Sequence, residues 1–238
     1  MTTLQPEATV AEIAANSLAA IGVFERLGID YCCGGKRPLA EACHAKGYSL
    51  GDVERELEAA NAKAPVSGVD WNTAPLPALI DHIVDTHHVY LKREMPLLSD
   101  RLAKVHRVYA ERRPGELDGL PEVYEQLRAE LDAHLMKEEL ILFPAIKAMV
   151  AAKETGIPAP PTCFGTIAHP VAQMEHEHEV AGAALVRIRE LTHDFTIPDY
   201  ACSTYRALIL GLEQFEQDLH RHIHLENNIL HRRAHELS

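Results

Sequence analysis

Two short segments of this chain carry the same pair of polar residues inside an otherwise apolar helical pattern. One segment has His134 and Glu138, the other has His222 and Glu226, and each pair is separated by four residues. On an α-helix this spacing puts both side chains on one face. A carboxylate on a buried helix face needs a compensating partner or a metal ion. The duplicated pair therefore favours packed helices that converge on a shared polar site.

Four long segments from residue 76 onward show apolar residues at helical spacing, and proline- or glycine-rich segments separate them. His88 and His178 lie on the first and third apolar stripes, about 45 residues before the two His-Glu pairs. The third stripe runs regularly from Ile167 to Ile188. We predict an all-α chain, an up-down four-helix bundle preceded by a small helical domain. The predicted stripe of the second helix runs through Leu127, Glu130, His134, Glu138 and Ile141.

The domain limits follow from shifts in the sequence pattern. Residues 1–64 predict a small helical domain, whose apolar pattern starts at Val10 and stops at Gly28. Residues 65–75 contain proline and glycine and predict a linker. Residues 76–238 are assigned to the bundle.

Composition restricts the class of protein. There are 23 Lys and Arg against 35 Asp and Glu, which gives a net charge of −12, and no long basic run occurs, so nucleic-acid binding is not expected. No apolar run is long enough for a membrane span and no secretory signal is visible, so we expect a cytoplasmic protein without a membrane partner. Five cysteines, an odd number, are then expected to be reduced thiols.

Four imidazoles and two carboxylates on the core stripes predict a two-metal site. If each metal takes two histidines and both glutamates bridge, each ion has four protein ligands. A solvent-derived bridge makes five and leaves one position open on an octahedral ion. This donor mixture favours non-haem iron, with manganese and zinc as alternatives.

Some assignments stay open at this point. His87 also falls on a workable stripe, although the 90 residues from His88 to His178 match the 88 from His134 to His222 better. Glu130 and Glu177 are candidates for carboxylates that support the ligands or handle protons. Eight further histidines have no such pattern and are expected at the surface: His82, His169, His176, His193, His220, His224, His231 and His235.

With these residues the chain resembles the repair-of-iron-centres family, hemerythrin-like di-iron proteins associated with mending iron–sulfur clusters after nitrosative or oxidative damage. The likeness covers nearly the whole length. It rests on Gly28–Lys36 with its Cys-Cys-Gly-Gly run, on Asp81–His88, on His134–Pro144, on Met174–His178 and on His222–Leu230.

The resemblance implies a hemerythrin-like bundle that holds two non-haem iron ions joined by an oxo or hydroxo bridge. It selects His88 over His87. One departure is visible, because the family usually has Phe-Pro where this chain has His231 and Arg232. The implied iron ligands are His88, His134, Glu138, His178, His222 and Glu226, with Glu138 and Glu226 bridging.

The resemblance also implies a function in iron–sulfur cluster repair by supplying iron, with damaged iron–sulfur proteins or a cluster scaffold as partners. Cys32 and Cys33 are candidates for thiol transfer in that process, because adjacent cysteines do not readily form a relaxed disulfide. Cys43, Cys163 and Cys202 are isolated and are expected to be structural. The alternative function is nitric oxide binding or reduction, and this reduction is the enzymatic activity that we consider. Reversible oxygen carriage is less favoured than either cluster repair or nitric oxide chemistry. A homodimer is left open.

Overall fold

The computed structural model describes residues 7–63, 69–158 and 161–237. Within these ranges the secondary structure is helical, apart from one isolated antiparallel bridge between Thr9 and Pro38. The chain forms two compact units, Met1–Ile80 with His220–Ser238, and Asp81–Leu219. Part of the linker predicted at 65–75 lies outside the described residues.

Four helices form the amino-terminal part of the first unit: α1 (Val10–Asn16), α2 (Leu18–Leu27), α3 (Leu39–Lys46) and α4 (Leu50–Lys63). Thr9 and Glu12 form a capping box at the start of α1. The apolar pattern from Val10 suggested one helix, but Ser17 is extended and its hydroxyl accepts a hydrogen bond from the Ala20 N–H, which starts α2 instead. Gly28 ends α2 with φ of 61°, as its position predicts.

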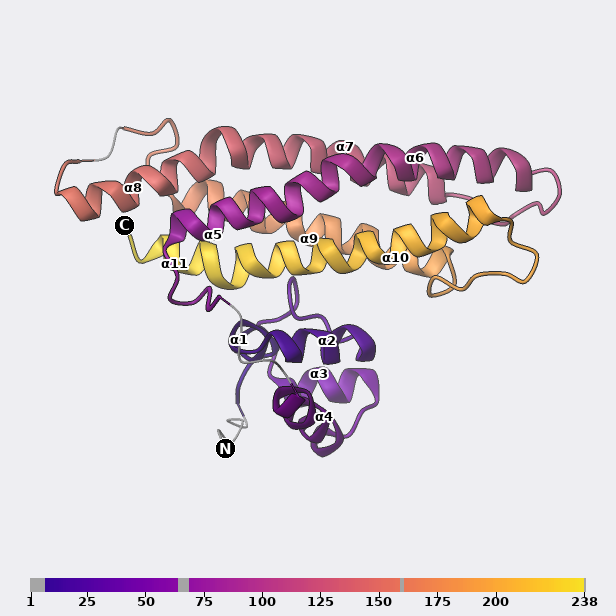
Figure 1. Cartoon of the computed structure of the whole chain (residues 1–238), viewed down its shortest axis with the longest axis horizontal. Coiled ribbons are helices and arrows are strands. Elements are labelled where there is room, and N and C mark those ends of the chain that lie inside the picture. The colour runs from indigo at the N-terminus through magenta and orange to yellow at the C-terminus, as the bar shows by residue number, and fades with distance from the viewer. Residues whose placement is uncertain (1–6, 64–68, 159–160, 238) are drawn as a thin grey trace. The chain divides into compact units, whose positions relative to one another are not determined.

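The long helices follow in four segments (Figure 1). Among them, α7 packs along α9, and α6 packs on α7. The prediction of an all-α chain with four long helices after a small helical domain is confirmed. In chain order the segments are α5 (Leu76–His82), η1 (Ile83–His88) and α6 (Val89–Tyr109); α7 (Leu120–Lys137), η2 (Glu138–Leu142) and α8 (Phe143–Thr155); α9 (Ala168–Leu191); and α10 (Ser203–His224), η3 (Leu225–His231) and α11 (Arg232–His235).

The buried faces follow the predicted stripes where the helix is regular. All apolar positions predicted on α9 from Ile167 to Ile188 are buried. The second stripe is wrong at two positions, since Glu130 and Ile141 are exposed while Leu131 and Leu142 are buried. The π-helical segment η2 explains why Leu142 is buried in place of Ile141. Each i→i+5 turn contains one residue more than an α-helical turn, so the residues after it that face the core are shifted by one position.

No helix among the residues that the structure describes is both long enough and apolar enough to cross a membrane.

Candidate metal centre

Three of the six predicted ligands lie in π-helical segments. His88 ends η1, Glu138 begins η2, and Glu226 lies in η3. In η2 the Phe143 N–H donates to the Glu138 carbonyl, and the next residue, Pro144, has no N–H to continue the ordinary helical ladder. Single π turns inside α-helices occur frequently at functional sites. Here they change the direction in which these side chains leave the helix.

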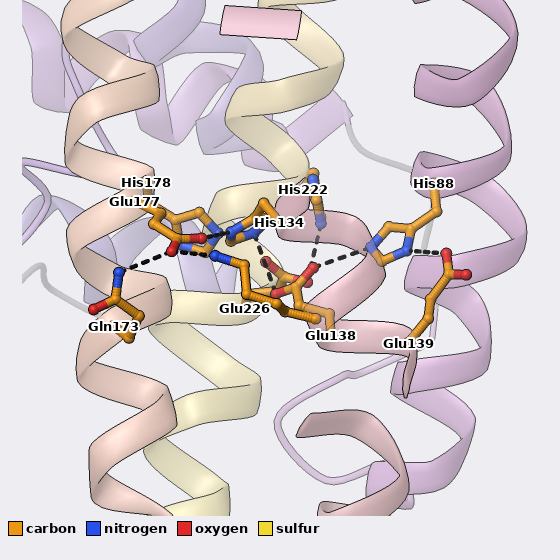
Figure 2. A network of polar contacts seen from close by, with 10 residues as sticks. His88, His134, Glu138, Glu139, Gln173, Glu177, His178, His222 and Glu226 are labelled. Atoms are coloured by element: carbon orange, nitrogen blue, oxygen red, sulfur yellow. Dashed lines mark hydrogen bonds and ion pairs between the residues drawn. The ribbon is translucent and has the colours of Figure 1, made fainter. Parts of the chain in front are cut away.

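The six side chains gather in two buried groups, each able to hold a metal ion (Figure 2). In each group the potential ligand atoms lie within 4.8 Å of one another. The side chains of His88, Glu138, His222 and Glu226 are inaccessible to solvent, and those of His134 and His178 almost so. The first group is His88, Glu138, His222 and Glu226, and the second is His134, Glu138, His178 and Glu226.

Both glutamates belong to both groups. Glu138 turns Oε2 towards Nε2 of His88 at 3.4 Å and Oε1 towards Nε2 of His134 at 3.3 Å. One carboxylate therefore offers one oxygen to each group, which is the arrangement that a bridging ligand requires. Glu226 also belongs to both groups, and its Oε1 lies 2.9 Å from Nε2 of His222.

The spacing of the nitrogen and oxygen atoms fits a metal. An octahedral ion with bonds of about 2.1 Å holds adjacent ligand atoms about 3 Å apart. The Nε2 atoms of His134 and His178 lie 3.0 Å apart, and the His222–Glu226 contact is similar. Two fully buried carboxylates would be costly without a cation or proton to offset them. The donor set of imidazole and carboxylate thus fits a pair of divalent transition-metal ions.

A carboxylate behind His88 fixes the orientation of that imidazole. The His88 Nδ1 atom lies 2.8 Å from Oε1 of Glu139. The same oxygen accepts a hydrogen bond from Lys92 Nζ at 2.5 Å. Burial acts to raise the pKa of the Glu139 carboxyl, but the hydrogen bonds from Lys92 and His88 outweigh it and hold that pKa below its ordinary value. The ionised carboxylate only accepts, so Nδ1 carries the proton and Nε2 is left to bind metal.

His134 is held in the same manner by Glu177. The His134 Nδ1 atom lies 2.8 Å from Oε2 of Glu177, whose other oxygen accepts from Lys137 and Gln173 (Figure 2). Burial again acts to raise the pKa of Glu177, and hydrogen bonds from Lys137, Gln173 and His134 lower it overall. Each group therefore contains one histidine supported by a glutamate and a lysine.

The two carboxylates proposed from the sequence have different environments. Glu177 contacts a ligand histidine, whereas Glu130 is exposed and accepts a hydrogen bond from Gln126. Sequence reasoning missed Glu139, which does contact a ligand. The only indication of its role is that it follows Glu138 directly in a π turn. In a regular helix the residue after Glu138 would lie on the outer face, so the helical pattern does not identify it.

Replacing either supporting glutamate by glutamine is expected to weaken metal binding about 10- to 100-fold, because the amide holds the imidazole less firmly and makes it less basic. Competition with a chelator at graded concentration would measure the affinities of Glu139→Gln and Glu177→Gln. Glu130→Gln serves as the matched control and should bind as the unchanged protein does. Equal affinities for all three variants would show that these contacts do not support the ligands.

The neighbouring histidine does not join either group. His87 is buried, but its Nδ1 contacts Oδ1 of Asp218 at 3.0 Å. His88 is the member of the adjacent pair that faces the glutamates. The side chain of His87 instead connects η1 to α10 within the second unit.

Two histidines expected at the surface are buried, and that prediction was wrong. His231 is fully buried in η3, at the position where the resembling family usually has phenylalanine. His224 is buried with its Nδ1 atom 2.8 Å from Asn228 Nδ2 and its ring against Tyr31. Burial lowers the pKa of His224 to about 4. His231 lies in the π-helical segment η3, which the apolar pattern does not reveal, whereas His224 ends α10 directly before that segment.

The two adjacent cysteines lie in a turn organised by Asp30. Its carboxylate accepts hydrogen bonds from the backbone N–H groups of Cys32, Cys33 and Gly34. Neither cysteine is in a disulfide, and their Sγ atoms lie 3.8 Å apart; Cys32 is buried and Cys33 is partly exposed. The hydrogen bond with Cys33, burial and the charge of Asp30 raise the pKa of Cys32. Cys33 is therefore the more accessible thiol of the pair.

The isolated cysteines differ from one another. Cys43 is buried, as a structural role requires, whereas Cys163 and Cys202 are exposed. The sequence expectation of a structural role has no support from packing at these two positions.

The helices and the two carboxylate-sharing groups define a class: a helical-bundle protein with a cation-binding centre suited to two metals. Comparison with known families agrees. Residues 79–234 match the Hemerythrin HHE cation binding domain, and residues 6–61 match ScdA_N, described as a Domain of Unknown function (DUF542).

Individual relatives are similar over almost the full chain. The iron-sulfur cluster repair protein YtfE of Citrobacter koseri and that of Escherichia coli O81 are each 38% identical over 223 residues, which is 94% of this chain and 94% of each relative. The YtfE protein of Escherichia fergusonii is 37% identical over the same share. The chain belongs to the YtfE family of iron-sulfur cluster repair proteins.

Proposed function

We propose that this chain is a di-iron protein that restores iron–sulfur clusters damaged by nitrosative or oxidative stress, by supplying iron. The observation that carries this is the pair of buried groups that share Glu138 and Glu226. Four imidazoles and two carboxylates are a donor mixture that suits iron. The names of its relatives support the repair function.

Iron held in this centre would supply a Lewis acid that can change oxidation state and exchange ligands. The ligand roles proposed for the chain are simple. His88 and His222 bind one ion, His134 and His178 bind the other, and the two glutamates bridge them. The carboxylates behind His88 and His134 keep Nε2 unprotonated for binding. An oxo or hydroxo bridge completes this proposal.

The identity of the metal has a direct test. Elemental analysis and Mössbauer spectroscopy of protein purified without added metal should give two coupled iron ions per chain. Manganese and zinc bind the same donor types and are the competing metals. A single zinc ion per chain would contradict the di-iron proposal.

Iron supply is tested with a cluster enzyme inactivated by nitric oxide. Iron-loaded protein is expected to restore its activity at least about fivefold faster than an equal amount of free ferrous iron, because the protein would deliver iron without loss to the solution. Metal-free protein is the control for chaperone-like effects. Equal recovery with free iron, or recovery with metal-free protein, would exclude donation. Damaged iron–sulfur proteins or a cluster scaffold are the proposed recipients.

The cysteine pair is proposed to assist this transfer. Cys33 is the more exposed thiol and would contact the recipient first, while Cys32 is held behind it. Cys33→Ser should slow cluster recovery with metal content unchanged, and Cys163→Ser, an exposed cysteine elsewhere, is the matched control. If Cys33→Ser recovered clusters as fast as the unchanged protein, Cys33 would have no part in the transfer step.

Nitric oxide binding or reduction is the second proposed activity. It is supported by the pocket that reaches His134 and His178, since a small ligand needs access to the centre. Anaerobic addition of nitric oxide to the ferrous protein should yield nitrous oxide if the centre reduces it. Absence of nitrous oxide would leave repair by iron supply as the stronger proposal. A cytoplasmic location and a homodimer stay predictions from the sequence.

A further inference from the structure

A pocket lies between α7 and α9, on the side of the second unit that carries His134 and His178. Its volume is about 320 Å³. Both ligand histidines line it, so the pocket leads from the outside of the helix pair to one of the two metal-binding groups. Its other charged or polar lining residues are Glu130, Lys137, Gln173, His176 and Glu177.

The two groups differ in their relation to the surface. The His88 side chain has 0% exposure, whereas that of His134 has 3% and lies on the pocket wall. The supporting carboxylates are similarly exposed, Glu177 at 22% and Glu139 at 26%, so the difference lies in the pocket, which Glu177 lines. A metal ion in the second group would therefore lie beside a pocket whose lining carries carboxylate and imidazole groups.

Lys137 adds a positive charge to the lining of this pocket. Its side chain is 41% exposed and its ammonium group pairs with Glu177. A lysine in this position repels a divalent cation and occupies the carboxylate that could bind the ion in transit. Glu130 and His176 supply further oxygen and nitrogen atoms on the pocket lining.

We propose that the metal ion of the group His134, Glu138, His178 and Glu226 enters and leaves through the pocket between α7 and α9, and that Lys137 restrains this exchange by holding Glu177. The inference rests on the proposed function as an iron donor and identifies which of the two ions is given up first. The ion moves as a divalent cation and exchanges its protein ligands for water, with no electron transferred.

The chain offers a matched pair of lysines for the test. Lys137 pairs with Glu177 behind His134, and Lys92 pairs with Glu139 behind His88. Replacement of either lysine by methionine removes the same kind of contact, but only Lys137 lines the pocket. The two variants therefore separate an effect on the route from an effect on the support of a ligand histidine.

The measurement is stopped-flow transfer of iron from the ferrous protein to a coloured chelator under anaerobic conditions. We expect two phases, one for each ion. Lys137→Met should accelerate the fast phase about fivefold, while Lys92→Met should accelerate the slow phase by no more than about twofold, because Lys92 supports a ligand histidine but does not line the pocket. Equal acceleration by both variants would overturn the proposal, as would no acceleration by Lys137→Met.

A second experiment blocks the pocket without a change in charge. Ala133 is exposed and lines the pocket, so Ala133→Trp should slow the fast phase about tenfold. Ala129 is an exposed alanine one turn earlier on α7, outside the pocket lining, and Ala129→Trp is the control. Both variants should still contain two iron ions at equilibrium. An unchanged fast phase in Ala133→Trp would exclude this route.

The outcomes separate this inference from the proposed function. The chelator reports release of iron whether or not the protein repairs clusters. Suppose that Lys137→Met accelerates release but the iron-loaded protein fails to restore a damaged enzyme. This result would support the exchange route and contradict the proposal of iron donation. If repair succeeds and neither Lys137→Met nor Ala133→Trp alters release, the exchange route is contradicted and iron donation is supported.

Discussion

Glu138→Gln is expected to abolish binding of both metal ions, so that the metal content of the loaded protein falls from two per chain to about none. Glu138 is shared by the two groups and turns one oxygen towards each. An amide has one oxygen and one nitrogen that only donates, so it cannot bridge two cations. The thermal stabilisation that metal gives to the folded state should disappear with the ions.

Single histidine variants provide the comparison. His88 belongs only to the first group and His134 only to the second. His88→Ala and His134→Ala should therefore each keep about one ion, in contrast to Glu138→Gln. Elemental analysis gives the stoichiometry, and thermal unfolding with and without metal gives the stabilisation. Two ions retained in Glu138→Gln, or similar losses in all three variants, would contradict a bridging carboxylate.

The sequence predicts most of what brings these residues together. A histidine and a glutamate four residues apart share a helix face at any depth in a protein, and the apolar residues around them predict that this face is buried. His178 on the regular helix α9 lies where its stripe puts it. The prediction of a helical bundle needs only this periodicity and the breaker-rich segments between helices.

The π-helical segments explain what the sequence did not reveal. Glu139 and His231 would face outward on stripes with a regular helical period, yet Glu139 contacts His88 and His231 is buried. A π turn is favoured by local hydrogen bonding and by the packing of the whole bundle, and no residue type marks it reliably. Ser17 is a different case, because its preference for capping a helix outweighs the apolar periodicity around it.

Charge at the centre is balanced by two matched pairs of side chains, each a glutamate with a lysine. Glu139 and Glu177 each combine a ligand histidine with a lysine. The lysines keep the carboxylates ionised, and the carboxylates keep Nδ1 protonated, so both imidazoles present Nε2 for metal binding. This symmetry makes the proposed difference between the two ions depend on Lys137 and the pocket rather than on the ligands themselves.

Gly35→Ala is expected to destabilise the cysteine turn by about 3 kcal/mol, at the upper end of the usual cost of overpacking. A Cβ atom at Gly35 would lie 2.6 Å from the Tyr31 carbonyl oxygen and 2.9 Å from Cβ of Ala11. The backbone cannot move away freely, because the Gly35 carbonyl accepts the Ala11 N–H at 2.8 Å and the Tyr31 carbonyl accepts from Asn228. The contact is with backbone, so a rotamer change cannot relieve it.

Two measurements check this expectation. Thermal unfolding should show a lower midpoint for Gly35→Ala, and peptide mapping after treatment with a thiol reagent should show faster labelling of the buried Cys32. Gly22→Ala is the matched control, since a Cβ added there would meet no atom within 4 Å apart from its chain neighbours and the nearby backbone of α2 itself. That variant should gain about 0.5–1 kcal/mol from the better helix former. Equal stability and equal Cys32 labelling in Gly35→Ala and Gly22→Ala would contradict this expectation. They would show that close backbone packing does not require glycine at position 35.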